Sequence, residues 1–301
     1  MIPKASSAPM LNRQRHLLSL LHALGGRVGN LDFQKLLFLY CQEEAPAPYE
    51  FVPYKFGAFS FTSYADRHKL VERRLLADEE NVWVLTDLGR RSLGTRTSAA
   101  VATFAAAHRR LKGDALVADT YRRFPYYATR SEIARKVLKG DANALQRIAD
   151  ARPSRIAGLS TIGYEGLSLE GYLNRLLQAG VTLLCDVRRN PLSRKYGFSK
   201  RTLARGCEGV GIRYEHLPEL GIDSVERQDL KTQADYDALF DRYERDMLPR
   251  QRPAVAAIVT WIQSGESVAL TCYEHLPVQC HRHCVAEAVE KAMQTVAAQH
   301  L

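Results

Sequence analysis

The stretch VTLLCDVRR (residues 181–189) is a short apolar run that ends in charged residues. It follows Gly180, and its charges are Asp186, Arg188 and Arg189. A continuous apolar run of this length is typical of a strand that is buried on both faces. Such strands occur mainly in parallel sheets that carry helices on both sides. We therefore expect a central strand with Asp186 and Arg188 at its carboxyl end.

The segments on either side alternate between strand and helix patterns. The strand patterns are STIGY (residues 160–164), IRYEHLP (residues 212–218) and SVALTC (residues 267–272). SLEGYLNRLLQAG (residues 168–180) is a helix pattern with Ser168 as its cap and Gly180 as its end. Further helix patterns cover residues 235–248, 253–265 and 281–298. This order predicts a Rossmann-like α/β domain with a parallel sheet over residues 151–301.

Polar residues follow every predicted strand of this domain. They are Tyr164 after the first strand, Asp186 and Arg188 after the second, Tyr214, His216 and Glu219 after the third, and Cys272 and Glu274 after the last. Open α/β sheets bind ligands at the carboxyl ends of their strands. The sequence therefore predicts one site at this edge, where Tyr164 or Tyr214 stacks on a base and His216 contacts the substrate.

The segment RRNPLSRKYGFSKRTLAR (residues 188–205) has seven basic residues and no acid, with Tyr196 and Phe198 among them. Basic and aromatic residues in alternation are typical of a grip on phosphates and bases. We expect Arg188, Arg194 and Lys195 to hold phosphate, Phe198 to contact substrate, and Lys200 and Arg201 to contact nucleic acid. A solvated loop is the alternative, and Arg188 has its own alternative as a buried ion pair with Asp186.

Two carboxylates across such a crevice suit glycosidic cleavage, in which one is protonated and the other is not. Asp186 and Glu274 are the candidate acid/base pair, and Glu219 is a weaker third carboxylate. The alternative for Asp186 is a structural role as the partner of Arg188.

The cysteine-rich stretch CYEHLPVQCHRHC (residues 272–284) has three interpretations. Its spacing matches no common zinc motif, so no cofactor is expected, and zinc at Cys272, Cys280 and Cys284 is a minority alternative. Cys280, His281 and Arg282 lie at the predicted start of a helix, which favours a nucleophilic Cys280 or a bound phosphate. In the version we favour, Cys272 and Cys280 are buried packing residues, while Glu274, His281 and Arg282 face the ligand.

The first half of the chain has a different pattern. Helix patterns at residues 15–26, 31–44 and within 49–76 precede the strand pattern NVWVLTDLGRRSL (residues 81–93), which we expect to turn at Gly89. Helices followed by a strand and a basic turn predict a winged helix-turn-helix over residues 1–150. The predicted phosphate contacts are Arg67, Lys69, Arg73, Arg74, Arg90 and Arg91. The Ala-rich residues 94–139 read as a helical bridge, and residues 149–158 as the domain boundary.

Charge is divided unevenly between the halves. Residues 1–150 contain 23 Lys and Arg against 15 Asp and Glu, a net +8, whereas residues 151–301 contain 19 against 18, a net +1. A basic half indicates a polyanionic partner, DNA or RNA. The sequence has no apolar run of the roughly 20 residues that a membrane span needs. It begins without a secretory pattern, so we expect a cytoplasmic protein.

Two family resemblances follow from these motifs. FQKLLFLYCQ, FVPYKFGAFSF and YRRFPYYATRSEI resemble bacterial winged-helix-like domains found near antitoxin-like and phage-defence genes, over residues 12–140. TIGYEG, CDVRRNPLSRKYGF, YEHLPELG and CYEHLPVQCHR resemble the domain of unknown function DUF488, over residues 158–296. The second resemblance implies a compact α/β domain linked in gene context to nucleic-acid transactions, with no settled reaction.

Three functions remain open from the sequence. The first is a nucleic-acid-directed hydrolase of a nucleotide or base, with N-glycosidic cleavage ahead of phosphoester cleavage, in DNA repair or phage defence. The alternative is a DNA-binding regulator that senses a nucleotide-like anion without catalysis. The third is a sulfur or phosphoryl transferase that depends on Cys280. The chain contains no Walker or G-x-G-x-x-G loop, so neither an NTPase nor a dinucleotide enzyme is expected.

Overall fold

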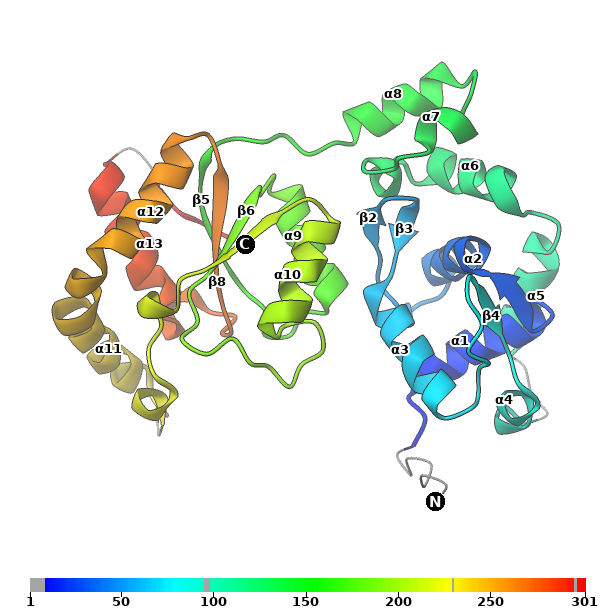
Figure 1. Cartoon of the computed structure of the whole chain (residues 1–301), viewed down its shortest axis with the longest axis horizontal. Helices are drawn as coiled ribbons and strands as arrows, with labels where there is room; N and C mark the ends of the chain where they lie inside the picture. The colour runs from blue at the N-terminus through cyan, green and yellow to red at the C-terminus, as the bar shows by residue number, and fades with distance from the viewer. Residues whose placement is uncertain (1–8, 95–97, 229, 295–296) are drawn as a thin grey trace. The chain divides into compact units, whose positions relative to one another are not determined.

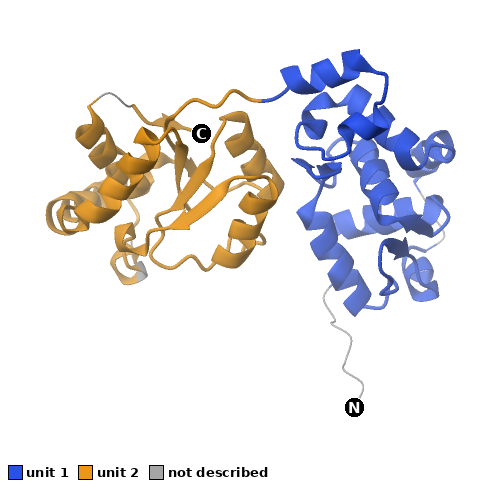
Figure 2. Ribbon diagram, turned by 45° about the horizontal axis from the view of Figure 1, so that its top comes forward, with its two compact units in different colours: residues 1–152 blue, residues 153–301 orange. Residues whose placement is uncertain are grey.

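The computed structural model describes residues 9–94, 98–228, 230–294 and 297–301. The chain divides into two compact units, Met1–Arg152 and Pro153–Leu301, which Figure 2 shows in separate colours. No helix in the described ranges combines the length and the apolar character that a membrane span requires.

The first unit begins with three helices and two short strand pairs. The elements are α1 (Asn12–Ala23), β1 (Arg27–Gly29), α2 (Asn30–Glu43), β2 (Val52–Tyr54), β3 (Gly57–Phe59), α3 (Phe61–Glu72), β4 (Val82–Val84) and α4 (Asp87–Ser92). β1 pairs with β4 and β2 pairs with β3, both antiparallel. Apolar side chains of α1 and α2 share one core with the buried Trp83 of β4, whose ring contacts Phe33 of α2. The three predicted helices and the strand at Trp83 are therefore confirmed, whereas β1 was not predicted.

The predicted turn at Gly89 is wrong. Gly89 lies inside α4, where its amide donates to the Thr86 side chain at 3.0 Å. Thr86 followed by Asp87 is a good helix start, and this local signal outweighs the turn preference of glycine. Arg90 and Arg91 accordingly lie in the last turn of a short helix. The winged-helix assignment of this unit stays a prediction.

The segment interpreted as a bridge is part of the packed first unit. It forms α5 (Ala99–His108), α6 (Gly113–Arg123) and α7 (Ala134–Val137), and α8 (Ala142–Asp150) follows. Val101 and Phe104 of α5 and Leu116 of α6 are buried in the same core as α1 and α2. The bridging role is therefore wrong for the described residues. Residues 95–97 of this segment lie outside the description.

The second unit contains a five-stranded sheet in the order β7-β6-β8-β5-β9. Its strands are β5 (Gly158–Gly163), β6 (Leu183–Asp186), β7 (Arg213–His216), β8 (Ser267–Cys272) and β9 (Gln299–His300). Every pairing is parallel. The prediction of an α/β domain with a parallel sheet is confirmed, while the edge strand β9 was not predicted.

Helices cover both faces of this sheet. α9 (Leu169–Gln178) and α10 (Lys200–Gly209) lie on one face, and α12 (Arg252–Gln263) and α13 (Arg282–Met293) lie on the other (Figure 1). α11 (Gln233–Arg242) precedes α12. The cap of α9 is the predicted one, because the Ser168 side chain accepts from Gly171 N at 2.9 Å. The predicted final helix, residues 281–298, ends earlier, and residues 295–296 lie outside the description.

The basic segment is a loop only in its first part. From Lys200 onward it forms α10, whose Leu203 and Cys207 are buried against the domain. The alternating charges hid the apolar face of this helix. Lys200, Arg201 and Arg205 are exposed on its other side.

Gly163, the last residue of β5, allows the loop after β8 to approach the sheet. A Cβ at this position would lie 1.8 Å from the backbone oxygen of Glu274. Backbone cannot yield to such a contact as a flexible side chain can. Gly158, at the other end of the same strand, has no atom within 4 Å of its Cβ position.

We expect Gly163→Ala to lower the free energy of unfolding by about 1–3 kcal/mol, because it forces the Glu274 backbone away from β5. Gly158→Ala is the matched control and should have little effect. Urea denaturation followed by circular dichroism measures both. Equal stability of the two variants would contradict the close approach.

Candidate functional site

A cavity of about 590 Å³ opens at the carboxyl ends of the strands of the second unit. It is lined from β5 by Tyr164, and from the segment after β6 by residues that include Arg188, Arg189 and Arg194. The segments after β7 and β8 contribute Arg227, Cys272 and Glu274, and His281 completes the lining. Residues at the ends of β5, β6 and β8 therefore line one cavity, whereas the residues predicted after β7, Tyr214, His216 and Glu219, do not lie on its lining.

Arg188 and Asp186 form a buried ion pair at the base of this edge. Arg188 Nε lies 2.8 Å from Asp186 Oδ1, and Arg188 Nη2 lies 2.5 Å from Asp186 Oδ2. The Asp186 side chain is fully buried, and Arg188 is 6% exposed. Arg188 also donates to Tyr164 Oη at 3.0 Å and to the Phe198 carbonyl at 2.9 Å. Arg188 therefore forms the buried ion pair with Asp186 that the sequence offered as the alternative to phosphate binding.

The three aromatic residues predicted to contact substrate are held by protein contacts. Tyr164 and Phe198 stack on each other, with ring centroids 4.3 Å apart, and both are buried. Tyr214 is half-buried and donates its hydroxyl to Asp186 Oδ2 at 2.6 Å. Only Tyr164 of the three lines the cavity. Tyr273 also lines the cavity, and its side chain is 45% exposed.

The remaining predicted contacts lie around the edge. His216 donates from Nε2 to the Arg188 carbonyl at 2.9 Å, and its Nδ1 accepts from Lys200 at 3.0 Å. Lys195 donates to the Tyr164 carbonyl at 3.1 Å. Glu219 is half-buried in the turn after β7. Arg194 lines the cavity and is exposed, as a phosphate contact requires.

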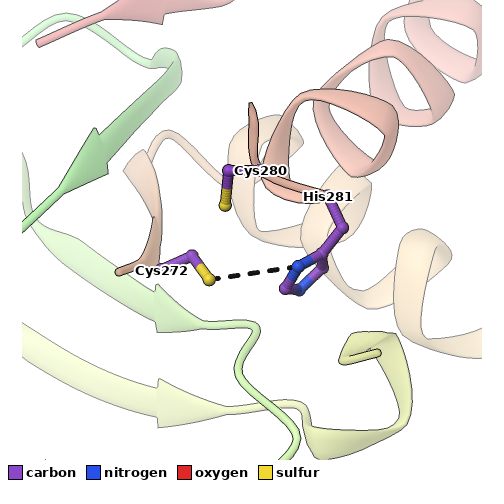
Figure 3. A group of neighbouring side chains, drawn as sticks. All are labelled: Cys272, Cys280 and His281. Atoms are coloured by element: carbon purple, nitrogen blue, oxygen red, sulfur yellow. Dashed lines mark hydrogen bonds between the residues drawn. The ribbon is translucent and has the colours of Figure 1, made fainter. Parts of the chain in front are cut away.

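Cys272 and His281 form a thiol–imidazole pair on the cavity wall (Figure 3). Cys272 Sγ lies 3.9 Å from His281 Nδ1. On the opposite side of the ring, Nε2 lies 3.0 Å from the Val187 carbonyl oxygen. A carbonyl only accepts, so Nε2 carries a proton, and in the neutral ring Nδ1 is the acceptor that faces the thiol. The arrangement is that of a nucleophile and an oriented base.

The surroundings favour the thiolate form of Cys272. A hydrogen bond from the Cys280 thiol holds the pKa of Cys272 well below its usual range, and the charges of His281 and Arg227 act in the same direction. Burial opposes this shift but is outweighed. Burial and the adjacent Cys272 raise the pKa of Cys280. Cys272, rather than the predicted Cys280, is therefore the thiol suited to attack.

Glu274 and Arg282 have protein partners. Glu274 forms an ion pair with Arg227 and lies 3.5 Å from Cys272 Sγ through its other oxygen. Arg282 is 1% exposed and donates to the carbonyls of Glu274 and His275, the second at 2.9 Å. The contacts of Arg282 thus fix the loop after β8, and Arg282 does not line the cavity that it was expected to face.

The cysteine cluster separates into two groups of candidate metal ligands. Cys272, Cys280 and His281 have their ligand atoms within 4.8 Å of one another, and Cys284 is grouped with Glu244 and His283. The zinc trio considered from the sequence is therefore divided between two places. Structural zinc takes four ligands, and in the described chain the first group offers three.

The predicted nucleic-acid contacts of the first unit differ in exposure. Arg67 is 8% exposed, donates to the Glu79 carbonyl at 2.7 Å and lies over the Trp83 ring, so it has a packing role. Arg90 lies 3.7 Å from Asp87. Lys69, Arg74 and Arg91 are exposed, and Arg73 is half-buried. On α10 of the other unit, Lys200 and Arg201 are exposed.

Most of the residues of this site lie in a segment that matches a known family model. Residues 168–289 match the family model of DUF488, a domain of unknown function. The DUF488 match supports the second resemblance and extends from the cap of α9 into α13. It includes Arg188, Cys272 and His281, whereas Tyr164 precedes it. No curated protein and no solved structure matches the chain.

Sequence reasoning missed three parts of the site. Cys272 is placed at the strand-end edge by the sequence, but as a packing residue or a zinc ligand and not as the nucleophile, although it ends an apolar strand as Asp186 does. That position was a usable signal. Arg227 lies in a turn after β7 with no recognisable pattern, and the Val187 carbonyl is a backbone group. Neither could be found without the fold.

We expect Asp186→Asn to lower the free energy of unfolding by about 3–5 kcal/mol, because it leaves the Arg188 charge buried and unpaired. Glu208→Gln, at an exposed carboxylate on α10, is the matched control and should be nearly neutral. The double variant Asp186→Asn with Arg188→Met should regain part of the loss. Urea denaturation measures all three, and a stable single variant would refute the role of the ion pair.

The pH dependence of alkylation reports on Cys272. Because the pKa of Cys272 is lowered, its thiolate persists below the ordinary thiol pKa of about 8.5, so iodoacetamide should label it there. His281→Gln should move the midpoint of the labelling rate to higher pH, and Cys284→Ser should leave it unchanged. Peptide mass spectrometry identifies the labelled residue. A midpoint near the ordinary value in the unaltered protein would contradict the lowered pKa.

Proposed function

We propose that the second unit is a thiol-dependent enzyme that acts on a phosphate-bearing nucleotide unit, with Cys272 as the nucleophile. The observation that carries the proposal is the pair of Cys272 and His281, 3.9 Å apart between Sγ and Nδ1, on the wall of an arginine-lined cavity. Nucleophilic catalysis needs a low-pKa thiol, an oriented base and a cavity that admits the substrate. The lowered pKa of Cys272, the orientation of His281 and the adjacent cavity support this role.

The charge on the lining supports an anionic substrate. Four arginines and two acids, Asp223 and Glu274, line the cavity. Arg188 and Arg227 are paired with carboxylates, but no described carboxylate pairs with Arg189 or Arg194. Guanidinium groups bind phosphate through two parallel hydrogen bonds. Arg189 and Arg194 are the residues that would hold it.

The chemistry follows from the positions of the two reacting groups. His281 Nδ1 takes the proton of Cys272, and the sulfur attacks phosphorus, which forms an S–P bond and breaks the P–O bond to the leaving group. His281 returns the proton to the leaving oxygen. Water then attacks phosphorus and gives its proton to His281 Nδ1, the S–P bond breaks, and the thiolate is restored beside the protonated imidazole. The buried Val187 carbonyl keeps the imidazole oriented through both steps.

The carboxylate mechanism receives less support from these contacts. Asp186 is fully buried and holds Arg188 through both oxygens, and Glu274 holds Arg227. An acid/base pair for N-glycosidic cleavage would have to give up these partners. The two carboxylates are therefore better suited to ordering the arginines, and N-glycosidic cleavage stays a prediction.

For the first unit we propose nucleic-acid binding, which would bring a DNA or RNA substrate to the enzyme. The net charge of +8 over residues 1–150 supports this role, as do the exposed Lys69, Arg74 and Arg91. Phosphate contacts of this kind give binding that weakens steeply with salt.

Turnover of phosphorylated nucleotides and of end-phosphorylated single strands tests the proposal. Cys272→Ser should lower the rate at least about 1,000-fold, because a hydroxyl at neutral pH is a far weaker nucleophile than a thiolate. Cys284→Ser should keep full activity. Mass spectrometry of the quenched enzyme should find a phosphate adduct on Cys272.

Three results would contradict the thiol mechanism. Loss of activity on chelation would point to metal chemistry at the same residues. A released free base that survives Cys272→Ser but not Glu274→Gln would establish the glycosidic reaction. Binding of nucleotides without turnover would favour the sensing regulator.

A further inference from the structure

The first unit contains a second cavity, of about 680 Å³, that the proposed enzyme does not use. Its lining comes from α2, from the hairpin formed by β2 and β3, and from Tyr64 of α3. Ile133, which precedes α7, and Lys136 of α7 also contribute to it. The cavity therefore lies where the hairpin packs on α2.

A buried lysine on this cavity lacks a carboxylate partner. Lys35 is 1% exposed, and its Nζ donates to the Ala58 carbonyl at 2.8 Å. Among the residues that the structure describes, no acid pairs with it. Burial lowers the pKa of Lys35 to about 7. A buried amine with one acceptor is costly unless a further acceptor reaches it.

The acids on the same cavity are engaged elsewhere. Asp32 accepts from Gly113 N at 3.0 Å, and Asp114 lies 3.4 Å from Lys136 Nζ. The lining thus contains two lysines and two acids. A strongly anionic ligand gains little electrostatic attraction from a lining whose formal charges cancel. A neutral polar ligand can supply a further acceptor for Lys35.

An unpaired acceptor belongs to the same lining. Asn30 Oδ1 is buried and has no hydrogen-bond partner in the described structure. Asn30 is the first residue of α2, and Lys35 follows on the same helix. An ammonium group with a single acceptor and an amide oxygen that lacks a donor therefore border one cavity. A ligand edge with both kinds of group would satisfy them together.

Aromatic side chains provide flat faces for a planar ligand. Tyr54 and Phe59 stack with ring centroids 4.8 Å apart, and the ring centroids of Phe59 and Tyr64 are 5.0 Å apart. Phe56, at the hairpin turn, is 46% exposed. Bases stack on such side chains with a gain of affinity at each ring.

We propose that this cavity binds a nucleobase with a lactam edge, in which a carbonyl lies next to a ring N–H, as in guanine and uracil. The carbonyl accepts from Lys35 and the N–H donates to Asn30, while the ring packs on Phe56 and Tyr54. Adenine and cytosine offer a ring acceptor beside an amino group, which is a different pattern.

Binding of nucleosides to the full chain tests this site apart from the thiol site, because nucleosides lack the phosphate that the arginines of the other cavity would hold. Guanosine and uridine should bind at least about tenfold tighter than adenosine and cytidine in calorimetric titrations. Lys35→Met should remove that preference. Cys272→Ser should leave both the affinity and the preference unchanged.

A second variant keeps the test decisive if Lys35→Met fails to fold. Phe56→Ala should weaken guanosine binding several-fold, and Leu88→Ala, a similarly exposed apolar residue on α4, should not. An oligo(dA) strand with one central guanine distinguishes a base within a strand from a free nucleoside. Equal affinity for all four nucleosides, no binding, or binding that both variants leave intact would overturn the proposal.

Discussion

The buried pair of Arg188 and Asp186 is the interaction on which the candidate site depends. Asp186 ends β6, and Arg188 connects it to Tyr164 after β5 and to the carbonyl of Phe198. Tyr214 of β7 donates to the same carboxylate, and His216 donates to the Arg188 carbonyl. One ion pair thus connects three strand ends and the middle of the basic segment. A paired charge with every lone pair satisfied can be buried, whereas an isolated one cannot.

The same pair helps to position the thiol proposed as the nucleophile. Val187 lies between Asp186 and Arg188 in the chain, and its carbonyl orients the His281 ring toward Cys272. Arg282 and Gly163 act from the other side, because they hold the loop after β8 close to β5. The geometry of Cys272 and His281 is therefore a product of backbone positions on three strands. A site supported in this way is preorganised before any ligand arrives.

Buried cations differ between the two units in a way that bears on function. Arg188 is matched by Asp186, and Arg282 by backbone carbonyls, so both are structural. Lys35 has a single carbonyl and no described acid, and Asn30 Oδ1 on the same cavity has no donor. Unpaired polar groups beside a cavity are costly to folding, and a ligand that satisfies them removes that cost.

The sequence by itself determined the α/β class of the second unit, because apolar strands such as residues 181–189 and helices capped as at Ser168 are local patterns. It also determined that polar residues gather at the strand ends. It could not give the roles of these residues, because the lowered pKa of Cys272 depends on neighbours from separate segments. Only the tertiary structure decided that Tyr164 and Phe198 stack in the interior and that residues 98–139 join a core. Those outcomes depend on contacts between distant residues, which no local pattern encodes.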